Sequence, residues 1–237
     1  MQSRNTSQTD RKAIKLDYSG MMSEVIGSER GITPQELEEL TPTVEVTAVK
    51  IDEKRDSGEY GFYRLPYDSA TTDAVLRMAE SFKGLYDNFV LLGIGGSALG
   101  AKALFQALCS PIHNQLSREE RKGIPRIHIL DNVDPVTMKS VLDHIDPEKT
   151  LFNVITKSGT TVETISQFLI VRKLLEDKLG QNPAAEHLVI TTGDISSRLY
   201  QLARENNYPL LNIPENVGGR FSVFSPVGLF PAAMAGI

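Results

Sequence analysis

Cysteine is almost absent from this sequence. Cys109 is the only one in 237 residues, so an internal disulfide framework is excluded and a reducing compartment is indicated. Its place near the end of a helical pattern predicts a small packed side chain rather than a nucleophile. The sequence therefore does not belong to the disulfide-rich secreted class.

Long apolar runs, basic clusters and metal-ligand spacings are missing as well. No run of 18 apolar residues occurs and the first ten residues are polar, so we expect neither a membrane span nor a signal peptide. The net charge of −5 and the dispersed Lys and Arg residues argue against a nucleic-acid surface. The four histidines show no metal-binding pattern. A local site for one small anion remains compatible with this composition.

The chain is predicted to contain two structural parts behind a loose tail at residues 1–10. Residues 11–68 are predicted to be an N-terminal arm that packs on something else. Within the arm, Thr33–Glu36 form a capping box that starts a short helix to about Leu40. Alternating apolar residues followed by Gly, Asp, Tyr and Pro predict an extended segment over residues 41–68.

Residues 69–237 alternate short apolar runs with helical periodicity. Nearly continuous apolar strands separated by helices are typical of a parallel sheet covered on both faces. The sequence therefore predicts a doubly wound α/β domain with a five-stranded parallel sheet. The expected strands are Phe89–Leu92, Ile127–Leu130, Phe152–Ile155, Leu188–Ile190 and Leu210–Ile213.

Ligands of such sheets bind outside the carboxyl ends of the strands, so the loops that follow the strands are informative. The loop Thr156–Thr161 carries four hydroxyl residues, and Thr164 follows one turn into the next helix. Hydroxyls and free backbone N–H groups at a helix N-terminus suit a phosphate. Ordinary helix capping is the alternative explanation of the same residues.

The first of these loops also fits a dinucleotide-binding pattern. Gly93–Ala98 satisfies G-x-G-x-x-A between a strand and a helix, which makes a nicotinamide-dependent dehydrogenase a rival interpretation. The acidic residue expected about 20 positions later is not convincingly placed, since Asp131 lies much further on. Two loops that converge on one monophosphate explain both this loop and the hydroxyl cluster better.

A third candidate motif is Gly218-Gly219-Arg220. The glycines permit close backbone approach, and the planar guanidinium suits a carboxylate, a phosphate or an enediolate. A glycine turn with a surface arginine is the structural alternative.

Together these motifs resemble the glucose-6-phosphate isomerase family over about residues 30–237. The resemblance is carried by Gly93–Ser97, by Thr156–Thr164 and most specifically by Glu215–Gly228. It implies a sugar-isomerase (SIS) fold and the interconversion of glucose 6-phosphate and fructose 6-phosphate through an enediol. It also implies a small sugar phosphate as ligand, no metal or organic cofactor, and a cytoplasmic homodimer.

The resemblance further implies a role for individual residues. Arg220 would be catalytic, beside the carbons that exchange protons, and Gly96 and Ser97 would lie near the sugar. The phosphate-binding residues would be Thr156, Lys157, Ser158, Thr161 and Thr164. At the first of these many relatives have Ser, which preserves the hydroxyl.

The resemblance also places several catalytic groups outside this chain. In that family the proton-shuttling carboxylate, a ring-opening histidine and a late lysine lie in a second SIS domain, whereas this sequence stops at Ile237 within an apolar run. We therefore expect the N-terminal part of a longer enzyme, inactive in isolation. A non-catalytic sugar-phosphate sensor is the alternative, although residues 1–68 lack a basic helix-turn-helix pattern and Gly218–Ser222 is typical of the isomerase.

Overall fold

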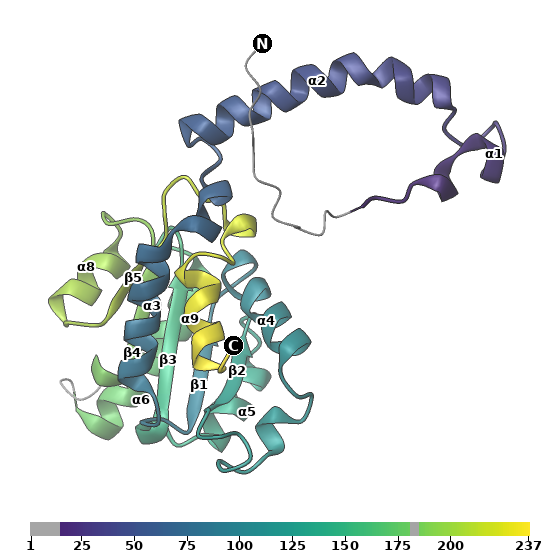
Figure 1. Ribbon diagram of the computed structural model, residues 1–237. Helices are drawn as coiled ribbons and strands as arrows, with labels where there is room; N and C mark the ends of the chain where they lie inside the picture. Colours follow the sequence, from purple (N-terminus) through teal and green to yellow (C-terminus); the bar gives the residue numbers. More distant parts are fainter. Residues whose placement is uncertain (1–14, 181–184) are drawn as a thin grey trace. The chain divides into compact units, whose positions relative to one another are not determined.

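The computed structural model describes residues 15–180 and 185–237, which divide into two compact units between Asp56 and Ser57. The second unit is built on five parallel strands in the order β2-β1-β3-β4-β5 (Figure 1). This confirms the predicted doubly wound α/β fold. The strands are β1 (Asn88–Leu92), β2 (Arg126–Leu130), β3 (Thr150–Thr156), β4 (Leu188–Thr192) and β5 (Leu210–Asn212).

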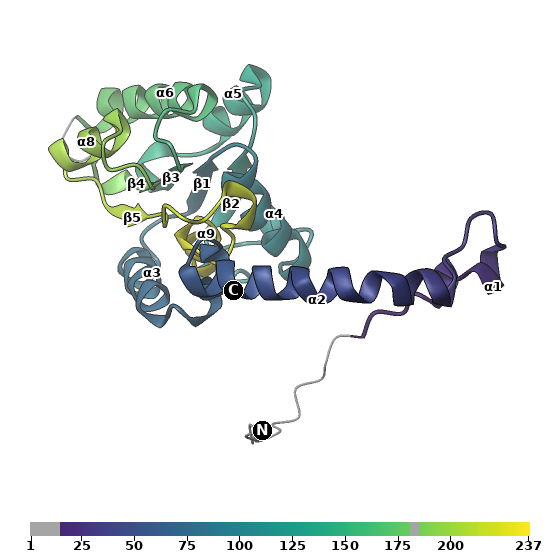
Figure 2. The same ribbon diagram turned by 90° about the horizontal axis from the view of Figure 1, so that it is seen from above.

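Helices cover both faces of this sheet, as Figure 2 shows. One layer contains α3 (Ser69–Phe82), α4 (Gly96–Leu108) and α9 (Pro226–Met234), and the other contains α5 (Pro135–His144), α6 (Val162–Leu179) and α8 (Arg198–Glu205). Successive side chains of a strand point to opposite faces. In β1, Phe89 therefore packs in the cluster with Phe230 of α9, whereas Val90 packs in the cluster with Phe168 of α6.

The central strands are completely buried because both faces are covered. Every residue of β1, β3 and β4 is buried, while the edge strands β2 and β5 are partly exposed. The parallel register pairs Leu92 of β1 with Leu130 and Val154, so the carboxyl ends of neighbouring strands lie at one edge. The loops that leave these strands are thereby gathered at that edge.

Four helices of this unit begin with a side-chain cap. Asp68, Asp134, Ser197 and Ser225 accept hydrogen bonds from amides in the first turns of α3, α5, α8 and α9 respectively. The two other helices, α4 and α6, have no side-chain cap among the described residues. The missing side-chain caps set these two helices apart and bear on the functional site.

Residues 57–68 belong to the sheet unit, which corrects their assignment to an extended arm. They contain the 3₁₀ helix η2 (Gly61–Tyr67), in which Leu65 is buried. The Gly61 amide donates to the Asn216 carbonyl, and the Phe62 ring stacks on Phe221 with a 4.6 Å centroid separation. Long-range contacts of this kind are not visible in local sequence patterns.

The first unit is dominated by the long helix α2 (Pro34–Ser57), preceded by η1 (Ser19–Met21) and α1 (Ser23–Ile26). The predicted capping box is confirmed: the Thr33 amide donates to the Glu36 carboxylate at 2.8 Å, and the Glu36 amide donates to the Thr33 hydroxyl at 3.2 Å. The predicted end near Leu40 is wrong, because the helix continues to Ser57. The predicted tail at residues 1–10 lies outside the described residues.

The prediction of an extended segment is wrong for residues 41–57, which are helical. It rested on a local alternation of apolar residues. An extended segment needs a neighbouring strand for its backbone groups, whereas a helix satisfies them internally. The helix tolerates Pro42 within its length and leaves Val44 and Val46 more than half exposed. None of the described helices combines the length and the apolarity needed to cross a bilayer.

Short 3₁₀ segments complete the sheet unit. They are η3 (His113–Gln115), η4 (Pro147–Lys149), η5 (Ala185–His187) and η6 (Gly219–Phe221).

Candidate active site

A cavity of about 540 Å³ opens at the carboxyl edge of the sheet. This volume falls within the range of small-molecule sites. Its walls come from the loops that follow β1, β3, β4 and β5, as expected for a doubly wound sheet. The lining residues are Ile94, Gly96, Ser97, Lys157, Ser158, Thr161, Gly193, Asp194, Ile195, Glu215 and Gly219.

The N-terminus of α6 supplies unpaired donors beside this cavity. Its N-cap residue, Thr161, does not cap the helix, because its hydroxyl is hydrogen-bonded to the Thr156 hydroxyl at 2.9 Å. The amides of Val162, Glu163 and Thr164 have no acceptor among the described residues, and the first bonded amide is that of Ile165. Three free N–H groups and the positive end of the helix dipole favour an anion here.

The N-terminus of α4 contributes less. Gly95, its N-cap, has a φ of 57° that favours glycine, and the Ser97 amide is already bonded to the Ile94 carbonyl at 3.1 Å. The Gly96 amide and the Ser97 hydroxyl have no partner among the described residues. This loop therefore adds two donors to those of α6.

The loop between β3 and α6 has little room for change. Gly159 has a φ of +67°, and a Cβ there would lie 2.2 Å from the Ser197 hydroxyl oxygen. The exposed Ser158 hydroxyl accepts hydrogen bonds from the Thr160 amide at 3.2 Å and from its hydroxyl at 3.0 Å. The glycine thus allows a tight turn that presents Ser158 at the cavity.

Lys157 connects three of the loops around the cavity. Its carbonyl accepts hydrogen bonds from the amides of Gly193 and Asp194 at 3.0 and 3.1 Å. Its ammonium donates to the carbonyls of Glu215 and Val217 at 2.7 and 2.9 Å. Two of the three ammonium donors are thus engaged by the chain itself.

The turn at Gly218–Arg220 approaches the α4 loop closely. A Cβ on Gly96 would lie 2.2 Å from the Gly219 carbonyl oxygen, so only glycine fits at that position. Arg220 itself is exposed, and its guanidinium has no hydrogen bond or ion pair among the described residues. It follows Gly219, which lines the cavity, but is not among the lining residues.

The charges of the lining do not by themselves favour an anion. Besides Lys157 the lining contains two carboxylates, those of Asp194 and Glu215. The Asp194 carboxylate accepts hydrogen bonds from the Ser196 hydroxyl and amide, which hold its pKa below its usual value. Asp194 is therefore a poor proton acceptor, and anion binding depends on the helix N-termini.

The structure brings together five of the eight residues expected at the site. Gly96, Ser97, Lys157, Ser158 and Thr161 all line the cavity. The remaining three, Thr156, Thr164 and Arg220, lie outside the lining.

Two of these three are buried beneath the loop. Thr156 is 1% exposed and Thr164 is fully buried, with no hydrogen-bond partner for its hydroxyl among the described residues. Sequence reasoning left six lining residues out of the expected site, namely Ile94, Gly193, Asp194, Ile195, Glu215 and Gly219. Their position directly after strands was the available signal.

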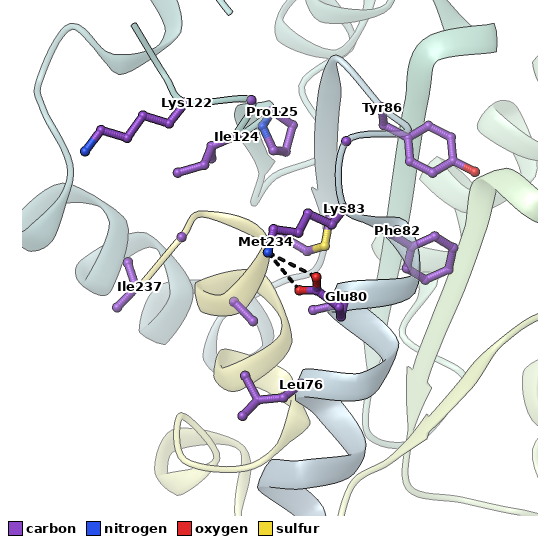
Figure 3. Close-up of a pocket in the computed structure, with 15 residues that line it drawn as sticks. Leu76, Glu80, Phe82, Lys83, Tyr86, Lys122, Ile124, Pro125, Met234 and Ile237 are labelled. Atoms are coloured by element: carbon purple, nitrogen blue, oxygen red, sulfur yellow. Dashed lines mark hydrogen bonds and ion pairs between the residues drawn. The ribbon is translucent and has the colours of Figure 1, made fainter. Parts of the chain in front are cut away.

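A second cavity, of about 390 Å³, lies between α3, the end of α9 and the loop Lys122–Pro125 (Figure 3). Apolar groups such as Leu76, Phe82 and Met234 line it, and the Glu80 carboxylate is paired with Lys83. It contains no uncapped helix N-terminus, so we do not assign the anion site to it. Among the described residues no cluster of His, Cys, Asp or Glu is suited to a metal ion.

The dehydrogenase alternative is not supported by the geometry. The nearest acidic residue after β2 is Asp131, and its carboxylate is paired with the Lys102 ammonium at 2.7 Å. The cavity also receives lining residues from the loop after β3, which has no part in the dinucleotide motif.

The fold is that of a doubly wound α/β protein with a cavity at the carboxyl edge of its sheet, beside the uncapped N-terminus of α6. The phosphoglucose isomerase family profile matches residues 77–236, and the chain belongs to that family. It is 43% identical over 226 residues to a glucose-6-phosphate isomerase of Carboxydothermus hydrogenoformans, covering 95% of this chain and 48% of that protein.

Two solved structures are similar to this chain. A hypothetical protein from Thermus thermophilus is similar with a TM-score of 0.74 and 38% identity, over 86% of this chain and 46% of that one. A glucose-6-phosphate isomerase from Chlamydia trachomatis is similar with a TM-score of 0.54 and 29% identity, over 68% of this chain and 28% of that one. The chain spans about half the length of the curated relatives it matches.

Proposed function

We propose that this chain forms the phosphate-binding half of an enzyme that interconverts glucose 6-phosphate and fructose 6-phosphate. The observation that carries the proposal is the uncapped N-terminus of α6 beside Ser158 and Thr161, at the cavity edge of a chain of this family. The three free amides of Val162–Thr164 and the Ser158 hydroxyl bind the substrate phosphate. Gly96 and Ser97 then lie beside the sugar.

The chemical step is a proton transfer between neighbouring carbons of the open-chain sugar through an enediol. Negative charge develops on an oxygen of the enediolate, and a fixed donor stabilises it more in the transition state than in the ground state. Arg220 supplies that donor: its guanidinium remains charged throughout, and the side chain is exposed beside the cavity. Its turn is held against Gly96 of the first loop.

The proton acceptor and the ring-opening acid are proposed to lie in the part of the relatives that this chain does not span. Support comes from one of the two lining carboxylates, that of Asp194, which accepts a hydrogen bond from Ser196. Positioned acid–base groups contribute about 10²–10⁴-fold each. The 237-residue chain is accordingly expected to bind sugar phosphate without turning it over. We also propose that the complete enzyme is a cytoplasmic homodimer.

A chimera tests this function directly. The chain is joined to the part of the Carboxydothermus hydrogenoformans relative that it does not match, and conversion of glucose 6-phosphate is measured in a coupled assay. We expect turnover in the chimera and none in the chain alone, with Arg220→Lys lowering kcat at least about tenfold and KM less. A folded chimera that binds glucose 6-phosphate without converting it would instead favour a sensor module.

A further inference from the structure

The side chain of Lys157 is already committed within the chain. Its ammonium donates to the Glu215 carbonyl at 2.7 Å and to the Val217 carbonyl at 2.9 Å, on a loop about 60 residues further along the sequence. Only one of the three ammonium donors is then left for a phosphate. The main partners of the Lys157 ammonium are therefore two backbone carbonyls of the chain itself.

The loop that Lys157 holds leads directly to Arg220. After Val217 the chain turns through two glycines, and a Cβ added at Gly219 would meet no atom within 4 Å. The Val217 amide donates to the Pro214 carbonyl at 3.1 Å, and the Phe221 amide donates to the Gly218 carbonyl at 2.9 Å. The Ser222 hydroxyl also donates to the Gly219 carbonyl at 2.8 Å, and the Phe221 ring stacks on Phe62, so the exit of the turn is held by its neighbours and its entry by the lysine.

The backbone of Lys157 is bonded to a third loop, the one that follows β4. Its carbonyl accepts the Gly193 and Asp194 amides, and the Thr192 hydroxyl lies 3.5 Å away. The ammonium consequently acts from a rigid base at the end of β3. The loops after β3, β4 and β5 are linked through this one residue.

We propose that Lys157 is a positioning residue that sets the place of Arg220 relative to the phosphate loop, rather than a ligand of the phosphate. The role of Arg220 in this inference is taken from the proposed function, whereas the anchoring contacts of Lys157 do not depend on it. A misplacement of about 1 Å costs on the order of 10²-fold at a reacting centre. Loss of the ammonium should therefore weaken contacts made through Arg220 and leave the phosphate contacts of α6 unchanged.

The test compares Lys157→Met with Lys157→Arg and with the control Lys173→Met. Lys173 lies on α6, 72% exposed, and pairs only with Asp177 among the described residues. Two probes are titrated by calorimetry: inorganic phosphate, and a sugar phosphate whose first carbon carries a hydroxamate as a mimic of the enediolate. Hydrogen exchange of the Val217 and Phe221 amides is measured without ligand.

For Lys157→Met we expect phosphate affinity within about threefold of the parent chain and hydroxamate affinity at least about tenfold weaker. Both loop amides should exchange about tenfold faster or more, the factor for one lost charge-assisted hydrogen bond. Lys157→Arg should retain much of the hydroxamate affinity and of the slow amide exchange of the parent chain. Lys173→Met should change neither quantity.

Unchanged exchange of the loop amides would overturn the proposal. So would a loss of phosphate affinity in Lys157→Met as large as that in Ser158→Ala, because it would make the lysine a phosphate ligand. Failure of the parent chain to bind phosphate would count against the proposed function alone. Hydrogen exchange of the Val217 and Phe221 amides needs no ligand and still tests whether Lys157 holds the loop.

Discussion

Replacing Gly96 by alanine should separate binding from folding. The added Cβ would lie 2.2 Å from the Gly219 carbonyl oxygen, closer than the 3.0 Å that Cβ atoms effectively never cross. One of the two backbone segments must therefore move by about 0.8 Å or more, close to the roughly 1 Å that costs on the order of 10²-fold in rate at a reacting centre. Gly96 is the first residue of α4, where alanine is otherwise favourable.

The matched control is Gly219→Ala, on the other side of the same contact. A Cβ there meets nothing within 4 Å, and the backbone does not require positive φ. Each variant is titrated with sorbitol 6-phosphate, which has no carbonyl to isomerise, and its thermal midpoint is recorded. We expect Gly96→Ala to bind at least about tenfold more weakly, with a small change in midpoint, and Gly219→Ala to match the parent.

Equal affinities of Gly96→Ala and the parent chain would refute the reasoning. They would mean that the turn after Val217 and the loop before α4 do not form one site, so that the close approach of Gly96 and Gly219 has no bearing on ligand binding. A large fall of the thermal midpoint in Gly96→Ala, with Gly219→Ala unchanged, would place the cost in folding instead.

Three further predictions concern the phosphate loop and the core. Ser158→Ala should lose one charge-assisted hydrogen bond and weaken phosphate binding about tenfold to a hundredfold by calorimetry, with Ser158→Asp weaker still. Gly159→Ala combines a φ of +67° with a clash against Ser197, so urea unfolding should show a larger loss of stability than in Gly84→Ala, where φ is +75° and no atom lies within 4 Å. Burial raises the pKa of Tyr86 to about 12, so its stabilising effect is present below the unfolded pKa of about 10 and is lost as pH rises towards 12; Tyr86→Phe should flatten that alkaline decline in urea titrations.

Much of the sheet domain was predictable because its signals are local. The run Phe89–Leu92 is apolar throughout, as a strand buried on both faces must be, and the structure buries all of it. Asp134 before Pro135 predicts a helix start, and the Asp134 carboxylate does accept the Val136 and Thr137 amides. Residue type and spacing decide such features within one element.

The details of the site depend on contacts between distant segments, which no local pattern contains. Lys157 was expected on the phosphate, but its ammonium reaches the Glu215 and Val217 carbonyls, whose proximity follows only from the order of β3, β4 and β5. The missing cap of α6 also arises from the fold, because the Thr161 hydroxyl is taken by Thr156. The same limit explains the wrong prediction for α2. Its alternating valines suggested an extended segment, but no strand of the sheet pairs with them among the described residues, and the segment is helical.

The central claim is that a phosphate group binds at the free N-terminus of α6, and NMR titration of the 237-residue chain with inorganic phosphate tests it most directly. The account predicts saturable shifts that are largest at the amides of Val162, Glu163 and Thr164, with no comparable change at the capped first turn of α5, at Val136 and Thr137. Phosphate shifts that are absent, or that are as large at α5 as at α6, would contradict the account.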